Sequence, residues 1–584
     1  MIYFVTLGRT HFLSKNTYLE IRRNPMNTTV SPIFRFWNML SLYRGQLSQI
    51  YLLGILNGVV NLSLPLGIQA IINFIQGAQI STSWVVLVGF VLLGITFTGI
   101  FQIMQLRIVE NIQQDIFTRS SFEFAVRVPK IKLLEMDKIH SPELVNRFFD
   151  TITIQKGMPK ILIDFSLASF QIVFGLLLLA FYSPYFIILG FVLIFILWLV
   201  IRVTGPKGLD ASLMESKYKY RIAHWLEEVA RTNKSFKLNT NSNLHLKKTD
   251  KLASKYLKAR ESHFSVLLMQ FKFFIAFKVL LAAGLLVLGS ILVLNEQMNI
   301  GQFVASEIMI ILIINSVEKL LRIIDTIYDV LTALEKIGYV TDLKMDEQDG
   351  IALFDKDKGI SLEGRKLKFG YPDKNAHLIE GLSFKIPAGC KTMVKGESGS
   401  GKSTFLHVMG GLLDINEGDF LINGVSIKNI NKDKYFSKIG YYFPTNQLFV
   451  GSFYDNLTMG KAVSDERVFE IIRLLDLQEF ISSLPMGIQA EIDPEGRRLP
   501  KSVIEKVLIG RAIIHKPKLL IMDDPLLFVT KEEKHRIITH IMSPEQPWTV
   551  LVATVYPFWK QNCTQIIDLG EVDYIQSVDS DLMI

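Results

Sequence analysis

The sequence contains little cysteine. Only Cys390 and Cys563 occur among 584 residues, far apart and without a C-x-x-C spacing. This pattern supports neither a disulfide framework nor a zinc site. We therefore expect the part of the chain that holds both cysteines to lie in a reducing cytosol.

The first 25 residues lack the uninterrupted apolar core and small-residue cleavage site of a secretory signal. They have a mixed basic character, and Met26 offers a second translation start. We leave residues 1–25 out of the fold argument for that reason, without treating them as a targeting peptide.

Lysine and arginine are missing from three short stretches, 76–82, 181–185 and 294–301, whereas 107–160 and 202–260 are dense in both. Basic residues in alternate connections are the signature of a membrane protein whose basic loops face the cytosol. Topology thus accounts for the net charge of +8. We expect contact with membrane lipids and no nucleic-acid partner.

Six apolar segments alternate with these connections, and each can supply the about 20 helical residues that a membrane span needs. They cover residues 47–75, 83–106, 161–182, 184–203, 268–294 and 302–324. Charged residues still make up 20% of the chain, too many for a protein buried wholly in lipid. A membrane half followed by a soluble half fits this composition.

The two long inner connections are polar with helical periodicity, so we expect the spans to continue as helices far into the cytosol. Each extension is expected to end in a short crosswise helix. The candidates are Met136–Asn146, with Ser141 and Pro142 at the helix start, and Ala223–Arg231.

A glycine-rich loop follows the expected strand Thr392–Lys395 and precedes an apolar helix that begins near Ser403. This is the context of a phosphate-binding loop, whose backbone N–H groups point at phosphate. Lys402 is expected to reach the β and γ phosphates, and the Ser403 hydroxyl to bind Mg²⁺. The predicted nucleotide-binding residues of the loop are Gly396, Glu397, Ser398, Gly399, Ser400, Gly401, Lys402, Ser403 and Thr404.

A second apolar strand, Leu519–Met522, ends in Asp523 and Asp524. Beside a phosphate-binding loop, such a strand positions the metal of a P-loop nucleotidase. We expect Asp523 to hold Mg²⁺ through water, with Asp524 approaching the γ phosphate.

Residues from about 40 to 584 resemble an ATP-binding cassette half-transporter of the exporter type. The loop carries the resemblance, together with Phe369-Gly370-Tyr371-Pro372 and the glycines of 410–424. It implies an α-helical membrane domain of six spans followed by an α/β P-loop domain. It also implies ATP and Mg²⁺ as ligands and Tyr371 as the platform for adenine; a buried tyrosine at a strand end is the alternative.

The expected domain limits are an N-terminal cytosolic segment at 1–40, a transmembrane domain at 41–335, a linker at 336–350 and a nucleotide-binding domain at 351–584.

The signature segment departs from the family. Leu499-Pro500-Lys501-Ser502-Val503 stands where the family has Leu-Ser-Gly-Gly-Gln. Pro500 has no amide hydrogen to donate, and side chains replace both glycines. Lys501 either supplies a compensating charge or is a solvated surface lysine.

Other catalytic positions depart as well. The family glutamine falls on Pro444, or on Thr445 with a shift of one residue. Asp524, the candidate catalytic base, replaces a glutamate and shortens its reach by one methylene. Val555 replaces the switch histidine, and Leu527–Thr530 replaces a subunit-contact loop that ends in aspartate.

These departures predict ATP binding with slow hydrolysis. The first reading is an exporter subunit, active as a homodimer or heterodimer in a bacterial inner membrane with its nucleotide domain in the cytosol. The second is an ATP-binding regulatory or structural subunit that does not hydrolyse. The membrane segments look like those of bacterial type I secretion and peptide exporters, which implies a peptide or protein substrate and a periplasmic adaptor. With no peptidase domain before the spans, leader cleavage is not expected.

Four charged residues fall in or beside the expected spans: Asp164, Lys272, Lys278 and Glu307. Charge inside a membrane is a functional indication by default. Lys272 and Lys278 alternatively reach toward the interface with their long side chains.

Overall fold

The computed structural model describes residues 31–76, 82–137, 139, 141–351, 359–372, 378–570 and 575–577. The chain forms two compact units, Met1–Ile131 with Glu135–Lys344, and Lys132–Leu134 with Met345–Ile584. Residues 1–25, with the alternative start, lie outside the described residues. Of the expected linker 336–350, the first six residues continue the last membrane helix, which ends at Thr341.

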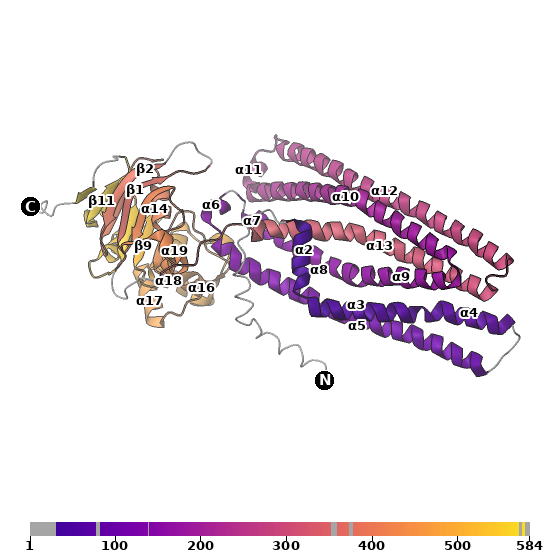
Figure 1. The fold of residues 1–584 in the computed structure, drawn as a ribbon. Helices are drawn as coiled ribbons and strands as arrows, with labels where there is room; N and C mark the ends of the chain where they lie inside the picture. Colours follow the sequence, from indigo (N-terminus) through magenta and orange to yellow (C-terminus); the bar gives the residue numbers. More distant parts are fainter. Residues whose placement is uncertain are drawn as a thin grey trace, which may run out of the picture. The chain divides into compact units, whose positions relative to one another are not determined.

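The first unit is helical (Figure 1). Six helical stretches are long and apolar enough to cross a membrane, by length and composition: Arg44–Gln76, Thr82–Lys130, Glu143–Tyr182, Tyr185–Arg231, Leu244–Leu294 and Ile300–Thr341. Five of them contain one of the expected apolar segments in full, and the fourth begins at Tyr185, one residue after the start of the expected segment 184–203. The α-helices of this unit are α2 Pro32–Ser41, α3 Arg44–Asn61, α4 Ser63–Gln76, α5 Thr82–Arg127, α7 Ser141–Asn146, α8 Asp150–Pro159, α9 Phe165–Tyr182, α10 Tyr185–Arg231, α11 Asn233–Leu238, α12 Leu244–Leu294 and α13 Ile300–Thr341, and the short α6 Leu133–Met136 has its first two residues in the second unit.

The longest helices exceed the membrane. Helix α12 has 51 residues and α10 has 47, so each is about 70 Å long, against about 30 Å for the hydrocarbon core of a bilayer. The expected helical extensions are therefore present. Helix α7 lies in the first stretch expected to be crosswise, but Ala223–Arg231 is the straight continuation of α10, and the separate short helix is α11.

The first span is broken near its middle. Helix α3 ends at Asn61 and α4 begins at Ser63, with Leu62 between them. Pro65 lacks an N–H group and its ring crowds the carbonyl of Asn61, four residues earlier, which interrupts the helical hydrogen bonds. The carbonyl of Asn61 therefore receives no helical hydrogen bond from position 65.

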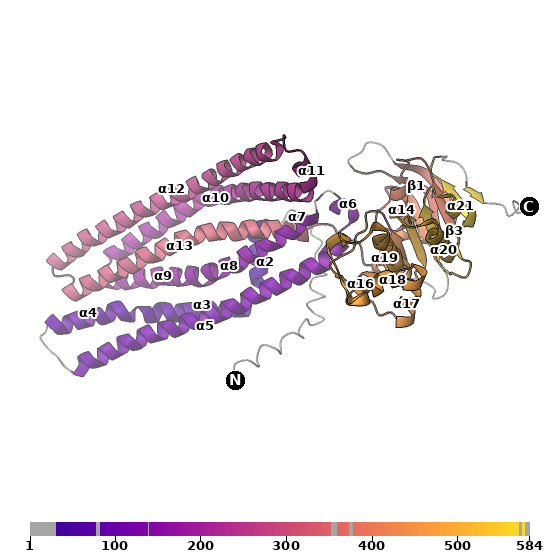
Figure 2. The same cartoon turned by 180° about the vertical axis from the view of Figure 1, so that it is seen from behind.

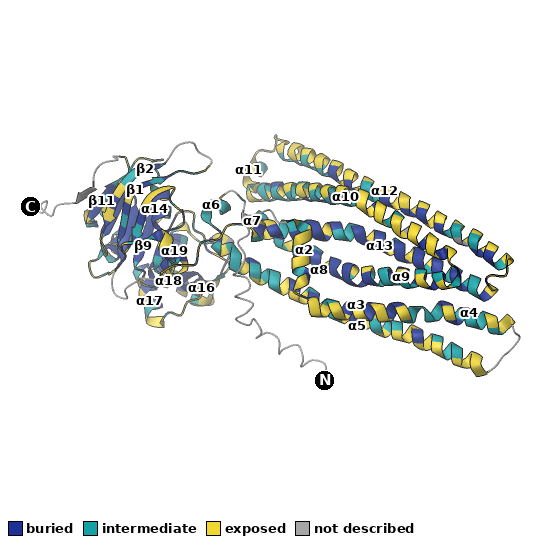
Figure 3. Cartoon of the chain, viewed as in Figure 1, coloured by how far each residue is buried: buried dark blue, intermediate teal, exposed yellow. Residues whose placement is uncertain are grey.

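Helix α13 is the most buried of the six candidate spans (Figure 3). It packs against α9 where Gly175 faces Ile313; a Cβ at Gly175 would lie 3.0 Å from the Ile313 Cγ1 atom. Small residues let membrane helices approach closely, and dispersion contacts then hold them together. Helices α5 and α10 instead carry many exposed apolar side chains.

The second unit is an α/β domain with a six-stranded sheet in the order β12-β11-β3-β10-β9-β6 and a four-stranded sheet in the order β2-β1-β4-β5. The short strands β7 Gly451–Ser452 and β8 Glu491–Ile492 form a separate pair. The strands of the two main sheets are β1 Leu362–Phe369, β2 Ile379–Ile386, β3 Lys391–Lys395, β4 Glu417–Ile422, β5 Val425–Ser426, β6 Ile439–Tyr442, β9 Leu519–Asp523, β10 Thr549–Ala553, β11 Gln565–Asp568 and β12 Ile575–Ser577. The helices are α14 Lys402–Met409, α15 Lys432–Phe436, α16 Phe453–Thr458, α17 Asp465–Leu474, α18 Gln478–Ser482, α19 Lys501–Ile513, α20 Lys531–Met542 and α21 Pro557–Asn562.

Alternation along the strands divides the core of this unit in two. In β9, Leu519 and Ile521 pack with the α14 side, whereas Leu520 and Met522 pack with α19 and α20. Successive side chains of a strand point to opposite faces, so a continuous apolar run fills both layers. Figure 2 shows α20 and α21 with the sheet from behind. The strands β3, β9, β10, β6 and β11 are parallel neighbours.

A partly buried ion pair joins two of these helices. Lys506 of α19 donates to the Oε1 atom of Glu533 in α20 at 2.5 Å, and the Oε2 atom of Glu533 accepts from the backbone N–H and hydroxyl of Thr530, closing a capping box. Burial by itself raises the pKa of Glu533, but the hydrogen bonds from Lys506 and Thr530 outweigh it and lower that pKa to about 2. Because the ordinary pKa is 4.5, this carboxylate stabilises the fold above about pH 4.5 and loses that contribution as the pH falls toward 2.

We predict that Glu533→Gln lowers the unfolding free energy of this unit by about 1–2 kcal/mol at pH 7, less than the full pKa shift implies because solvent partly screens the pair. The measurement is thermal unfolding of the purified chain in detergent at pH 7 and at pH 3. The deficit should shrink at pH 3. The matched control is Glu532→Gln, an exposed neighbour in the same turn; an equal loss in both variants would contradict the assignment.

Candidate functional site

The glycine-rich loop lies between β3 and α14, within one residue of the expected strand and helix limits. Gly399 and Gly401 have φ angles of +88° and +90°, a left-handed conformation that only glycine adopts without strain. A Cβ at Gly401 would also lie 3.1 Å from the Leu378 Cγ atom. The loop therefore depends on glycine for its backbone shape and for its packing.

Two polar groups of the loop indicate what it can hold. The Lys402 ammonium donates to the carbonyl oxygens of Gly396 and Glu397, at 2.8 Å each. The Ser400 hydroxyl is buried and has no hydrogen-bond partner within the described residues. An orphaned donor beside a lysine and a helix N-terminus fits an anion such as phosphate.

Tyr371 lies just beyond the end of β1. Its ring packs edge-on against Phe369, with ring centres 5.2 Å apart, and its hydroxyl lies 3.3 Å from the hydroxyl of Thr404. The aromatic side chain expected to contact adenine therefore lies beside the helix that follows the phosphate loop. Ser403, the expected metal ligand next to Thr404, is exposed.

Asp523 ends β9 and is 8% exposed. The N–H group of Asp524 donates to the carbonyl of Ala553 at 2.7 Å, and Asp524 has a φ of +39°. Burial, and next the charge of Asp523, raise the pKa of Asp524; the hydrogen bond with Thr554 and the charge of Lys402 oppose them. A carboxyl group with a raised pKa is a stronger base once ionised.

Glu505 is a site residue that the sequence analysis missed. It is 2% exposed and accepts hydrogen bonds from the Tyr442 hydroxyl at 2.9 Å and from the N–H groups of Leu527 and Phe528 at 2.8 Å each. It thus fixes the backbone of the segment 527–530 against α19. The available signal was a carboxylate inside an otherwise apolar helical run, which a buried position tolerates only with partners.

The signature segment runs into the start of α19. Pro500 is the N-cap residue, and its side chain makes no capping hydrogen bond. The Lys501 ammonium lies 4.8 Å from the centre of the Phe528 ring, a cation–π contact. Phe528 thus contacts α19 twice. Its backbone N–H group donates to Glu505, and its ring contacts the Lys501 ammonium. Lys501 is exposed and Phe528 is 52% exposed, so Lys501 is a surface lysine that also contacts an aromatic ring of the same chain.

The remaining departures lie on the surface. Pro444 and Thr445 are exposed in a turn that Asn446 closes by accepting from the N–H group of Phe443 at 2.7 Å. Val555 is 82% exposed, and its side chain has no hydrogen-bonding atom. The structure therefore brings the loop, Tyr371 and the two aspartates into one unit. Position 555, where the family has a histidine, offers no hydrogen bond to a nucleotide.

Comparison with known proteins agrees with this architecture. Residues 48–317 match the family model of the ABC transporter transmembrane region, and residues 379–527 match that of the ABC transporter domain. A solved structure of a bacterial Atm1-family ABC exporter with ATP bound superimposes with a TM-score of 0.82, covering 92% of this chain and 96% of that one at 16% identity. That likeness shows the fold.

Curated relatives are distant. The colicin V secretion/processing ATP-binding protein CvaB of Escherichia coli is 28% identical over 250 residues, 42% of this chain and 36% of that protein. The transport/processing ATP-binding protein ComA of Streptococcus pneumoniae is 20% identical over 299 residues, 50% of this chain and 41% of that protein. The chain thus spans about half or less of the length of the curated relatives it matches.

We predict that Lys402→Ala weakens retention of a labelled non-hydrolysable ATP analogue at least about tenfold, because a charge-assisted contact to phosphate is lost. The measurement is equilibrium binding to the detergent-solubilised chain. Lys385→Ala, at an exposed lysine of β2, is the matched control. Equal retention of the ATP analogue by Lys402→Ala and by the unchanged protein would show that the loop does not bind the nucleotide.

A second prediction concerns Glu505→Gln. A carboxamide offers one acceptor oxygen where the carboxylate has two, so a buried backbone N–H loses its partner at a cost of about 1–3 kcal/mol. Hydrogen–deuterium exchange should become faster at residues 527 and 528. Glu479→Gln, an exposed glutamate of α18, should leave that exchange unchanged. Unchanged protection in Glu505→Gln would show that Glu505 does not order this segment.

Proposed function

We propose that this chain, a half-transporter of the ATP-binding cassette exporter type, uses ATP binding at its second unit to drive outward transport by its first unit. The observation that carries the proposal is the orphaned Ser400 hydroxyl beside Lys402, in a loop whose shape requires glycine. Half-transporters function in pairs, so a second copy or a related chain completes the assembly. Closure of two nucleotide domains on ATP alternates access between the membrane sides.

In the proposed nucleotide site, the loop N–H groups and Lys402 hold the phosphates, and Tyr371 stacks on the adenine. Ser403 and Asp523 hold Mg²⁺, which when bound neutralises charge on the β and γ phosphates. Two observations support this arrangement. The Tyr371 hydroxyl lies 3.3 Å from the Thr404 hydroxyl, and the charges of Asp523 and Lys402 act in opposite directions on the pKa of Asp524.

We further propose that hydrolysis is slow. The Val555 side chain donates no hydrogen bond, and Pro500 has no N–H group. The Lys501 ammonium lies 4.8 Å from the centre of the Phe528 ring. Asp524 is the remaining base, with a raised pKa but a shorter reach than glutamate. General-base action normally contributes about 10²–10⁴-fold, so partial loss leaves binding intact while turnover falls.

We propose a peptide or protein as the substrate. Proteins named for colicin V secretion/processing and for transport/processing are among the distant matches, which supports this substrate class. A bacterial inner membrane and a periplasmic adaptor belong to the same proposal and rest on the resemblance of the membrane segments to bacterial secretion exporters. The second candidate is an ATP-binding regulatory subunit that does not hydrolyse. Val555 has no hydrogen-bonding side-chain atom and Pro500 has no N–H group, and both departures favour this second candidate.

The test separates these candidates. The purified chain in sealed vesicles, facing a pool of labelled peptides, should show ATP-dependent uptake together with ATP turnover far below that of an intact exporter. Asp524→Asn should reduce the residual turnover by at least about tenfold and leave analogue binding unchanged. Tight analogue binding without uptake, unless another transporter is present, would favour the regulatory subunit. Fast turnover that persists in Lys402→Ala would overturn both.

A further inference from the structure

Helices α10, α12 and α13 run side by side and pack against one another in pairs (Figure 1). All three continue beyond the expected apolar segments on the cytosolic side: after residue 203 in α10, before 268 in α12 and after 324 in α13. A helical extension outside the membrane usually keeps its charged and titratable side chains in water. One histidine of this extension is instead buried between the three helices.

His263 of α12 is 1% exposed. Its Nδ1 atom lies 2.8 Å from the Oε2 atom of Glu215 in α10, and its Nε2 atom lies 3.7 Å from the Oδ1 atom of Asp325 in α13. Tyr328 of α13 packs edge-on against the ring, with ring centres 6.1 Å apart. The Nε2 atom is buried and has no hydrogen-bond partner within the described residues. The ring therefore lies between carboxylates of two other helices, with one nitrogen bonded and the other unbonded.

The partners of Glu215 determine which nitrogen of the ring carries the proton. Arg260 donates to both oxygen atoms of Glu215, at 3.2 and 3.3 Å, and the Tyr256 hydroxyl donates to Oε1 at 3.3 Å. A nearby cation and hydrogen-bond donors favour the ionised carboxylate, which can only accept. The Nδ1 atom of His263 is therefore the donor. In a neutral ring the Nε2 atom then has a lone pair, and it faces a second acceptor, the carboxylate of Asp325.

Uptake of one proton changes this arrangement. Both nitrogens of a charged imidazolium donate, so Nε2–H can bond to Asp325 while Nδ1–H keeps its bond to Glu215. The distance of 3.7 Å is about 0.7 Å longer than a usual hydrogen bond. The Asp325 side chain is 45% exposed and has room to approach. The charged ring thus joins all three helices, whereas the neutral ring joins only α10 and α12.

The charges around the ring match this change. Glu215, Asp325 and Asp329 supply three negative charges. Arg260 of α12 and Lys219 of α10 supply two positive ones. One more positive charge on the ring makes the cluster neutral, and opposite charges at these separations attract one another.

Two uncharged links join the same helices. Gln270 of α12 donates to the Thr204 hydroxyl of α10 at 2.8 Å and to the Tyr328 hydroxyl of α13 at 3.1 Å. The hydroxyls of Ser212 in α10 and Thr332 in α13 lie 2.9 Å apart. None of these groups changes charge near neutral pH. They therefore hold the helices together whether or not the histidine is charged, and the proton adds a further link.

We propose that His263 is a proton-controlled clamp. At acidic cytosolic pH the charged ring bonds both Glu215 and Asp325 and holds α13 against α10 and α12; at alkaline pH the neutral ring releases Asp325. A histidine side chain ordinarily changes charge between about pH 5 and 8. Because alternating access requires helices to shift relative to one another, the clamp slows transport when the cytosol becomes acidic. Only this last step rests on the proposed export function.

The clamp is measured by hydrogen–deuterium exchange of the full chain in lipid nanodiscs without nucleotide, at pH 5.5 and pH 8. Each rate is divided by the intrinsic rate of an unstructured amide at the same pH. On this scale, residues 325–332 of α13 should exchange about tenfold more slowly at pH 5.5 than at pH 8, because a hydrogen bond between charged groups opposes separation of the helices.

Two variants remove the clamp in different ways. His263→Gln keeps a donor for Glu215 but gains no charge, and Asp325→Ala removes the acceptor. Both should match the unchanged chain at pH 8 and lack the additional protection at pH 5.5. The matched control is His245→Gln, which changes the other histidine of α12 and should keep the full difference between the two pH values.

Equal protection of residues 325–332 at both pH values in the unchanged chain would overturn the clamp. A pH difference that survives in His263→Gln and Asp325→Ala would overturn it too. A loss of protection that is the same at pH 5.5 and pH 8 in these variants would assign the two side chains a purely structural role, and the clamp would again be wrong.

The step from clamp to transport is tested in sealed vesicles whose cytosolic face is outside, in buffer at the same two pH values. ATP-dependent uptake of labelled peptides should fall at pH 5.5, and it should fall less in His263→Gln than in the unchanged chain. An equal fall in both would overturn this step. Absence of uptake at either pH, with the exchange result intact, would overturn only the proposed export function.

Discussion

Parallel strands that end at one edge of a sheet are the constraint on which the nucleotide site depends. β10 pairs with both β3 and β9, and Ala553 faces Val394 and Asp523 across the ladders. The segments that follow these three strands therefore leave the sheet side by side. The hydrogen bond from the Asp524 N–H group to the Ala553 carbonyl continues this pairing past the strand end. The phosphate loop, the paired aspartates and Thr554 meet because of backbone hydrogen bonds, before any of their side chains interact.

Near that edge of the sheet, buried hydrogen bonds fix neighbouring segments relative to one another. Glu505 connects α19, the end of β6 and the segment 527–530 through three accepted hydrogen bonds. Such a group is stable in the core only when all its partners are present. The loss of the signature glycines is therefore not isolated: Lys501, in one of the glycine positions, contacts the same Phe528 that Glu505 orders.

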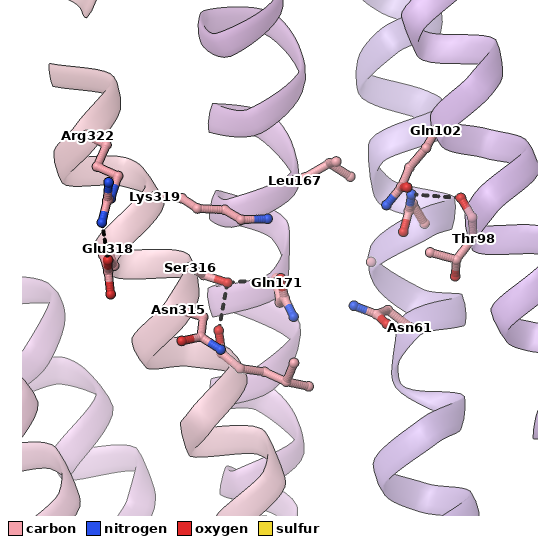
Figure 4. A pocket seen from close by; sticks show the side chains of 13 residues that line it. Asn61, Thr98, Gln102, Leu167, Gln171, Asn315, Ser316, Glu318, Lys319 and Arg322 are labelled. Carbon is pink, nitrogen blue, oxygen red and sulfur yellow. Dashed lines mark hydrogen bonds and ion pairs between the residues drawn. The ribbon is translucent and has the colours of Figure 1, made fainter. Parts of the chain in front are cut away.

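The two units differ in how their polar side chains find hydrogen-bond partners. In the second unit, several buried polar side chains bond to the backbone, as does Lys391, which donates to the carbonyls of Gln546 and Trp548. In the membrane unit, a polar cavity lined from α3, α5, α9 and α13 instead holds Gln102 and Asn315 with exposed side chains (Figure 4). Polar side chains exposed to such a space bond to water.

Sequence alone determined the elements that depend on local pattern: six apolar runs long enough to span a bilayer, their basic connections, and the glycine loop between a strand and a helix. These signals are local, because span length and left-handed backbone are properties of neighbouring residues. Tertiary structure decided what depends on distant residues: that Glu505 orders the segment 527–530, that Lys501 contacts Phe528, that Ala223–Arg231 continues α10, and that carboxamides of four spans share one cavity. Residues far apart in the chain meet only through packing, which periodicity does not encode.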